Sequence, residues 1–217
     1  MSQNTVRPVK IGVGSGGFTG ALDAGDRFGA SVLNLGDVDG DGVEDLAVGA
    51  PGDDDGGAEQ GAVWILFLRT DGTVRDYQKI SSEFGNFDGL AEGEPWFGIA
   101  LAKTGDLNGD GVPDLAVKSA PTSYILLLDA AGGVISYDRV SSLGDDPRFN
   151  GMCGTGDFNN DGVNDLAETG SSYLGLPGGV GVRYLDSNGR SINGVPLQGT
   201  HPYRSLGCPG DLDTQRS

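Results

Sequence analysis

The sequence predicts an all-β chain made of repeated four-stranded antiparallel units, and three observations carry this prediction. Glycine accounts for 40 of the 217 residues without the period of collagen, as expected where many short strands join through tight turns. One Asp-rich segment recurs along the chain, and short apolar runs follow each complete copy. No segment has the convincing apolar periodicity of an amphipathic helix.

An Asp-rich segment of nine residues marks each repeat. Complete copies span residues 37–45, 106–114 and 157–165. A fourth copy begins at Asp211 and Asp213, but Gln215 takes its fifth position and the chain ends before its ninth. An aromatic residue precedes each copy by eight or nine residues, about the length of one short strand. These aromatic residues are Phe28, Phe97, Phe149 and Tyr203.

Apolar runs and turn signals follow each complete segment in a fixed order. A small apolar run comes first, at 46–48, 115–117 and, more weakly, 166–168. A longer run follows, at 62–68, 124–128 and 180–185. Hairpin signals come next, at Asp71-Gly72, Gly132-Gly133 and Asn188-Gly189, and last strands are expected at 74–80 and 134–140. The longer runs are apolar at nearly every position, so we expect both faces of these strands to be covered, as in the stacked blades of a β-propeller.

These units predict a single partial β-propeller over residues 1–217. Residues 5–11 align with the last strands, so they are expected to be the outer strand of a preceding blade. Complete blades are expected at 12–80, 81–140 and 141–196, and residues 197–217 begin a truncated fourth blade. Closed propellers usually have about four to eight blades. The chain is therefore interpreted as part of a larger propeller, or as a piece completed by other copies.

The three complete segments predict calcium sites. Ca²⁺ takes about six to eight hard oxygen ligands, and alternate residues of a curled loop can all point inward. Oxygen-bearing side chains stand at positions 1, 3, 5 and 9, and the backbone carbonyl of position 7 is expected to add another ligand. The predicted ligands are Asp37, Asp39, Asp41, Val43 and Asp45; Asp106, Asn108, Asp110, Val112 and Asp114; and Asp157, Asn159, Asp161, Val163 and Asp165. We expect about three calcium ions per chain, with a structural role favoured over catalysis or sensing.

The spacing separates these segments from the calcium loops of helical hands. Those loops close with a bidentate Glu at position 12. Here position 12 is Val48, Val117 or Glu168, so the ninth-position Asp is expected to close each site. Glycine at position 6 permits the tight bend. The incomplete fourth segment is not expected to bind calcium.

The repeats resemble the FG-GAP repeats of integrin α-subunit propellers and of related bacterial extracellular proteins. Besides the loops, the resemblance is carried by Phe28-Gly29, Val48-Gly-Ala-Pro51, Phe97-Gly98 and Ala120-Pro121. The third repeat departs from the pattern, with Phe149-Asn150 and Thr169-Gly170. The resemblance implies that calcium loops on one face stabilise the blades and that ligands bind the opposite face. It also implies an extracellular or cell-surface location and candidate ligand loops at 51–61 and 79–95.

Charge and composition exclude several classes of partner. The formal net charge is -17, from 31 acidic and 14 basic residues, and this field repels nucleic acids and anionic lipid surfaces. No apolar stretch approaches the length of a membrane span, so no membrane insertion is expected. The first eight residues lack the apolar core of a signal peptide, so an exported form would have lost its signal or derive from a longer precursor.

Several other features leave alternatives open. Cys153 and Cys208 are interpreted as buried small hydrophobic residues, with a disulfide as the alternative. Asp53, Asp54 and Asp55 form a further cation site or, as favoured here, a solvated turn. Trp64 and Trp96 are both expected in the core, and His201 on the surface. Residues 12–17 match G-x-G-x-x-G, but no helix or βαβ unit surrounds them, so nucleotide binding is not expected.

The leading hypothesis is a non-catalytic extracellular module for adhesion, ligand binding, or surface or matrix assembly. Its partner would be a protein, a glycan or other copies of the chain, which includes homo-oligomers. No nucleophile–base pair, carboxylate dyad or histidine cluster is evident in the sequence. Two alternatives stay open: the propeller domain of a secreted polysaccharide-active or other hydrolase or lyase, and a self-associating subunit that forms a closed ring or filament.

Overall fold

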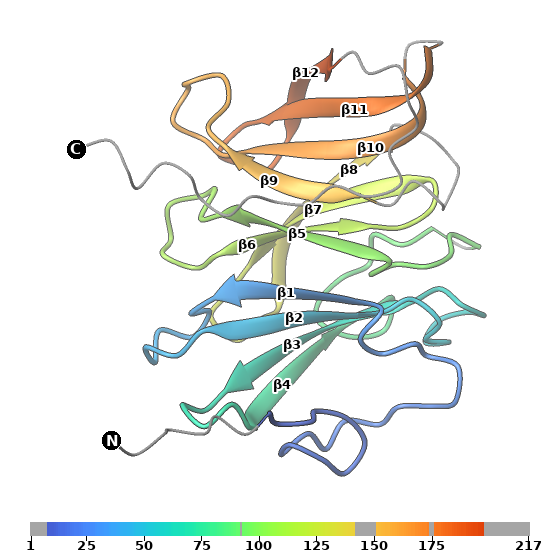
Figure 1. Cartoon of the computed structure of the whole chain (residues 1–217), viewed down its shortest axis with the longest axis vertical. Helices are drawn as coiled ribbons and strands as arrows, with labels where there is room; N and C mark the ends of the chain where they lie inside the picture. The colour runs from blue at the N-terminus through green and yellow to red at the C-terminus, as the bar shows by residue number, and fades with distance from the viewer. Residues whose placement is uncertain (1–7, 92, 142–150, 174–175, 198–217) are drawn as a thin grey trace.

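A computed structural model of the chain describes residues 8–91, 93–141, 151–173 and 176–197. Within these ranges there are twelve strands and no helix, and the strands form three antiparallel sheets of four (Figure 1). The predicted all-β class with four-stranded antiparallel blades is therefore confirmed. Over the same described ranges, no helix has the length and apolar character needed to span a membrane.

In each sheet the strands lie side by side in chain order. The first sheet contains β1 (Ser31–Gly36), β2 (Asp45–Ala50), β3 (Ala62–Leu68) and β4 (Val74–Ile80). The second contains β5 (Ala100–Gly105), β6 (Asp114–Lys118), β7 (Thr122–Leu128) and β8 (Val134–Ser141). The third contains β9 (Met152–Gly156), β10 (Asp165–Tyr173), β11 (Leu176–Leu185) and β12 (Ser191–Leu197).

The three sheets stack face to face along the long axis of the molecule (Figure 1). One apolar cluster joins the first and second sheets, with Ile65 and Phe67 of β3 packed among Leu115 and Leu126 of the second sheet. Another joins the second sheet to the third through side chains such as Ile125. Because a sheet lies on each side of the second one, all seven residues of β7 are buried. The expectation that the third strands are covered on both faces is thus met for β7, and β3 is buried except at its last residue.

Phe97, the aromatic residue before the second Asp-rich segment, fills the interface between the first and second sheets. Phe97 is fully buried and stacks on Phe87, with ring centroids 5.0 Å apart, while Tyr124 meets it edge-on at 5.7 Å. In the first sheet Phe18, Phe28 and Trp64 form an equivalent cluster. Trp64 is 2% exposed, so its predicted place in the core is confirmed.

Glycine permits the close approach of the first two sheets. A Cβ atom on Gly49 would lie 2.0 Å from the carbonyl oxygen of Gly98, far inside van der Waals contact. This backbone oxygen also accepts a hydrogen bond from Ser31 Oγ at 2.7 Å. The two repeats therefore touch backbone to backbone at the end of the sheet that lies away from the Asp-rich segments.

Some sequence predictions need correction. No strand is assigned at residues 8–11, and residues 5–7 lie outside the described ranges, so the outer strand of a preceding blade at 5–11 stays a prediction. Trp96 is only half-buried, because its backbone has a φ of 65° and its indole N–H turns to Glu59. Cys153 is buried as predicted, but it is disulfide-bonded, so the alternative given for it is the correct one.

Several predicted features lie outside the described residues. They are Phe149, the incomplete fourth segment from Asp211 to Gln215, Tyr203, His201 and Cys208. The G-x-G-x-x-G match at residues 12–17 is described, and it contains a short turn in which Gly12 and Ser15 pair. No helix follows this turn in the described part of the chain.

Candidate metal centres

The three Asp-rich segments lie at the same end of the stacked sheets. Each connects the first strand of its sheet to the second, and all three connections appear along the left edge of Figure 1. Since the sheets are similar and stack in parallel orientation, the repeat in the sequence becomes a row of three similar loops in space. We call residues 37–45, 106–114 and 157–165 the first, second and third Asp loops.

The loops are curled by their own side chains. The first-position aspartates accept hydrogen bonds from the amides of the fifth and sixth residues, at 2.8–3.1 Å. The fifth-position aspartates accept from the amide of the seventh residue, at 2.8–2.9 Å. The sixth residue is glycine with φ between 86° and 91° in all three loops, a backbone conformation that other residues rarely adopt. The sequence thus forces the carboxylates toward the inside of each loop.

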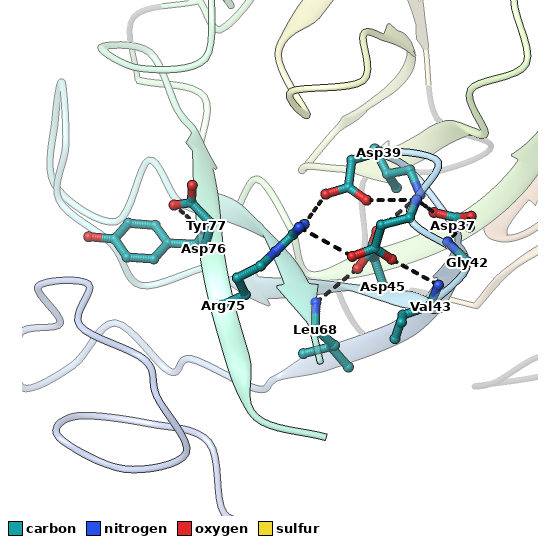
Figure 2. A network of polar contacts seen from close by, with 11 residues as sticks. Asp37, Asp39, Gly42, Val43, Asp45, Leu68, Arg75, Asp76 and Tyr77 are labelled. Atoms are coloured by element: carbon teal, nitrogen blue, oxygen red, sulfur yellow. Dashed lines mark hydrogen bonds and ion pairs between the residues drawn. The ribbon is translucent and has the colours of Figure 1, made fainter. Parts of the chain in front are cut away.

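The ninth-position aspartate ties each loop to its sheet. Asp45, Asp114 and Asp165 are fully buried. One carboxylate oxygen accepts from the amide of the second loop residue, at 2.8–3.0 Å. The other accepts from the amide of the last residue of the third strand, at 2.9–3.1 Å. Figure 2 shows this second bond in the first loop, between Leu68 and Asp45. The sequence predicts only a metal-binding role for these residues, and their second role, holding the third strand, is visible in the structure alone.

Burial also destabilises the ionised form of these carboxylates, so a nearby positive charge would stabilise them. Desolvation raises the pKa of Asp114 to about 6, although the backbone hydrogen bonds from Leu128 and Leu107 act in the opposite direction. Desolvation raises the pKa of Asp45 and of Asp165 as well. The neighbouring loop carboxylates add to the rise in each case. A cation in the loop would relieve both effects, because it stabilises the ionised carboxylates.

The oxygen atoms of the first loop are spaced for a calcium ion. Carboxylate oxygens of Asp37, Asp39 and Asp45 all lie within 4.8 Å of one another. Ligands at about 2.3–2.6 Å from one Ca²⁺ ion are separated by up to about 5 Å, so these atoms can share an ion. The donors are hard oxygens without histidine or cysteine, which suits calcium better than zinc. The second and third loops have the same internal hydrogen bonds with Asn at the third position.

A positively charged side chain that the sequence analysis did not identify reaches the first loop. Arg75, on β4, forms an ion pair with Asp39 (Figure 2) and a second one with Asp41, at 3.2 Å. It lies far from these residues in the sequence, and only the pairing of β3 with β4 brings it beside the loop. Arg75 is a single basic residue 36 positions from Asp39, so no local pattern in the sequence links it to the acidic loop.

The candidate ligand loops, 51–61 and 79–95, lie at the opposite end of the sheets, along the right of Figure 1. The favoured solvated turn at Asp53 to Asp55 is wrong for Asp53, which is buried. Lys79 forms ion pairs with Asp53, at 2.8 Å, and with Asp55. Its ammonium group also lies 5.1 Å from the ring of Trp64. A lysine of the chain itself thus offsets part of the negative charge of the acidic turn.

The same end of the molecule is held together by polar side chains. Gln60 donates a hydrogen bond to the carbonyl oxygen of Ala91, which ties the two loops together. The buried carboxylate of Glu94 accepts from Tyr124 at 2.7 Å and from Arg139 at 3.2 Å. Burial acts to raise the pKa of Glu94, but these hydrogen bonds outweigh it, so the pKa is lowered and the group stays charged. Phe84 stands outside this network and is 50% exposed.

Comparison with known proteins agrees with this architecture. Residues 28–66 and 97–127 match the FG-GAP repeat family. Integrin alpha-PS5 of Drosophila melanogaster is 35% identical over 109 residues, which are 50% of this chain and 10% of that protein. Integrin alpha-5 of Xenopus laevis is 37% identical over 101 residues, 46% of this chain and 9% of that protein. Integrin alpha-M of Mus musculus is 36% identical over 107 residues, 48% of this chain and 8% of that protein.

The chain spans about a tenth of the length of these relatives. The family match falls on β1 to β3 and on β5 to β7, and it includes the first and second Asp loops. The third loop lies outside the matched residues, yet it repeats their hydrogen bonds. The chain therefore contains two segments that match the FG-GAP repeat, within stacked four-stranded sheets, and it resembles integrin α subunits over about half of its length.

Proposed function

We propose that this chain is a calcium-stabilised, non-catalytic propeller module that acts in adhesion at the cell surface or outside the cell. The observation that carries the proposal is the row of three Asp loops at one end, each joined to its sheet by a buried aspartate. Calcium at these loops would fix the blades. The connections at the opposite end are then free to contact a partner.

Each loop would supply a similar set of ligands to its ion. The carboxylate and amide oxygens of positions 1, 3, 5 and 9 would bind the ion, and the carbonyl oxygens of Val43, Val112 and Val163 would add one ligand each. About three ions per chain would cancel about six of the negative charges. Because a cation that binds only the folded state stabilises it, the calcium ions would contribute directly to the free energy of unfolding.

The resemblance and the cysteine chemistry both favour an extracellular or cell-surface location. The relatives named above are integrin α subunits. Cys153 is disulfide-bonded, and disulfides persist mainly in oxidising compartments. The millimolar calcium of such compartments would also keep loops of modest affinity occupied.

A protein partner is proposed for the end formed by loops 51–61 and 79–95. Two aromatic side chains, Phe84 and Trp96, are accessible in or beside these loops, and aromatic residues are enriched at protein interfaces. The hydrogen bonds and ion pairs described above hold these loops in place, which lowers the entropic cost of binding. A glycan partner would use the same aromatic surfaces.

Solid-phase binding tests this proposal. Immobilised chain should bind one or more proteins of an extracellular-matrix panel in calcium, and lose that binding in EDTA. The double variant Phe84→Ala, Trp96→Ala should bind at least about tenfold more weakly, as loss of two interface aromatics implies, while its calcium uptake is unchanged. The double variant Ile135→Ala, Ile192→Ala, which removes two exposed apolar side chains outside these loops, is the matched surface control. Release of reducing ends from a polysaccharide by the chain would instead support the hydrolase or lyase alternative.

A further inference from the structure

The first Asp loop differs from the other two at one ligand position. Its third residue is Asp39, whereas the second and third loops have Asn108 and Asn159. In those loops the side-chain amide donates a hydrogen bond to Oδ2 of the fifth-position aspartate, at 2.8 and 2.7 Å. An ionised carboxylate has no hydrogen to donate, so Asp39 cannot make this bond.

Arg75 supplies the missing donor. Its Nη1 lies 3.2 Å from Oδ2 of Asp41, the atom that the amide contacts in the other loops, and its Nη2 contacts Asp39 (Figure 2). Arg75 follows Val74, which pairs with Leu68, the last residue of β3. The equivalent residues of the other two sheets are Ile135 and Ile192, which are 54% and 58% exposed. The extra carboxylate and the arginine thus occur together, in one repeat of the three.

We infer that Arg75 is an internal counter-ion of the first Asp loop. Without calcium, its guanidinium group balances the additional charge and keeps the loop curled. An incoming Ca²⁺ ion has to compete with this group for Asp39 and Asp41, so Arg75 lowers the calcium affinity of the first loop. The first loop is therefore ordered without calcium by a charged group that the ion has to displace, whereas the second and third are ordered by an uncharged amide. This inference rests on the proposed binding of calcium to the loops.

The variant Arg75→Ile tests the inference, because isoleucine is the residue of the other two repeats. Hydrogen exchange is followed by mass spectrometry on peptides that contain each Asp loop, across a series of free calcium concentrations. In the variant, protection of residues 37–45 should be lost in EDTA. The free calcium concentration that gives half of the full protection of this loop should fall about tenfold. Coulomb's law gives an effect of about this size for the repulsion between a single positive charge and a nearby divalent ion in water. The midpoints of the second and third loops should not move.

Two further variants separate the local contact from net charge. Arg27→Asn removes the same charge at the opposite end, where Arg27 pairs only with Glu59 among the described residues, and it should leave the midpoint of the first loop unchanged. The double variant Asp39→Asn, Arg75→Ile gives the first loop the side chains of the second. It should regain protection in EDTA, because the introduced amide can donate to Asp41.

The outcomes distinguish this inference from the proposed function. A calcium response at all three loops that is identical in wild type and Arg75→Ile would overturn the role of Arg75 and leave the calcium sites intact. Absence of calcium-dependent protection at every loop would overturn the proposed function and this inference with it. A selective shift at residues 37–45 would support both.

Discussion

Removal of calcium is expected to lower the melting temperature of this protein by more than any single substitution. A ligand that binds only the folded state at about 100 to 1,000 times its Kd stabilises it by about 3–4 kcal/mol per site. A change of 1 kcal/mol moves the melting temperature of a chain of this size by about 2–4 °C. With three loops loaded, we therefore expect the melting temperature to fall by at least about 10 °C when EDTA replaces millimolar calcium.

Differential scanning calorimetry measures this directly. Because the net charge is -17, any salt stabilises the chain by screening repulsion, so the EDTA sample needs KCl at matched ionic strength. Magnesium is a second control, since it requires a more rigid octahedral set of ligands and should restore less stability. Equal melting temperatures in calcium and in matched KCl would contradict a structural role for the ion.

The second large effect is expected from Asp114→Ala. This carboxylate is fully buried and accepts hydrogen bonds from Leu107 at 2.8 Å and from Leu128 at 3.0 Å. Its removal leaves two buried amides without these acceptors, at about 1–3 kcal/mol each. We expect a loss of about 2–6 kcal/mol in the free energy of unfolding, measured by urea denaturation in EDTA. In calcium the loss should be larger, since one ion is lost as well.

Asp110→Ala is the matched comparison in the same loop. Asp110 is exposed and accepts from Val112 and Asn108 within the loop, so its removal breaks no bond to the sheet. This variant should lose the second calcium ion but remain within about 1 kcal/mol of wild type in EDTA. If both variants were equally stable in EDTA, the ninth-position aspartate would have no structural role of its own.

The strands could be predicted because their signals are local. The run at 62–68 and the last strand at 74–80 match β3 and β4 residue for residue, since apolar runs and Gly-containing turns mark their ends. The Asp loops were visible for the same reason: their ligands are consecutive in sequence, and glycine at position 6 fixes the bend. Because the complete segment occurs three times, each time with the same flanking strand signals, the sequence also predicts three sheets.

The contacts that depend on strand pairing could not be predicted in this way. Lys79 pairs with Asp53 and Asp55, and Arg75 pairs with Asp39 and Asp41, only because strand register places distant residues side by side. A cluster of aspartates with no basic neighbour in sequence was therefore interpreted as solvated. The hydrogen bond between each ninth-position aspartate and the third strand could not be predicted for the same reason. Its donor is the last residue of that strand, which lies 14 to 23 residues away in the sequence.

Isothermal titration calorimetry of the chelator-stripped protein with calcium tests the central claim most directly. The account predicts saturable uptake of about three ions per chain, falling to about two in Asp110→Ala, because each loop forms a separate site. Binding of no calcium at millimolar concentration, or an unchanged stoichiometry in Asp110→Ala, would contradict it.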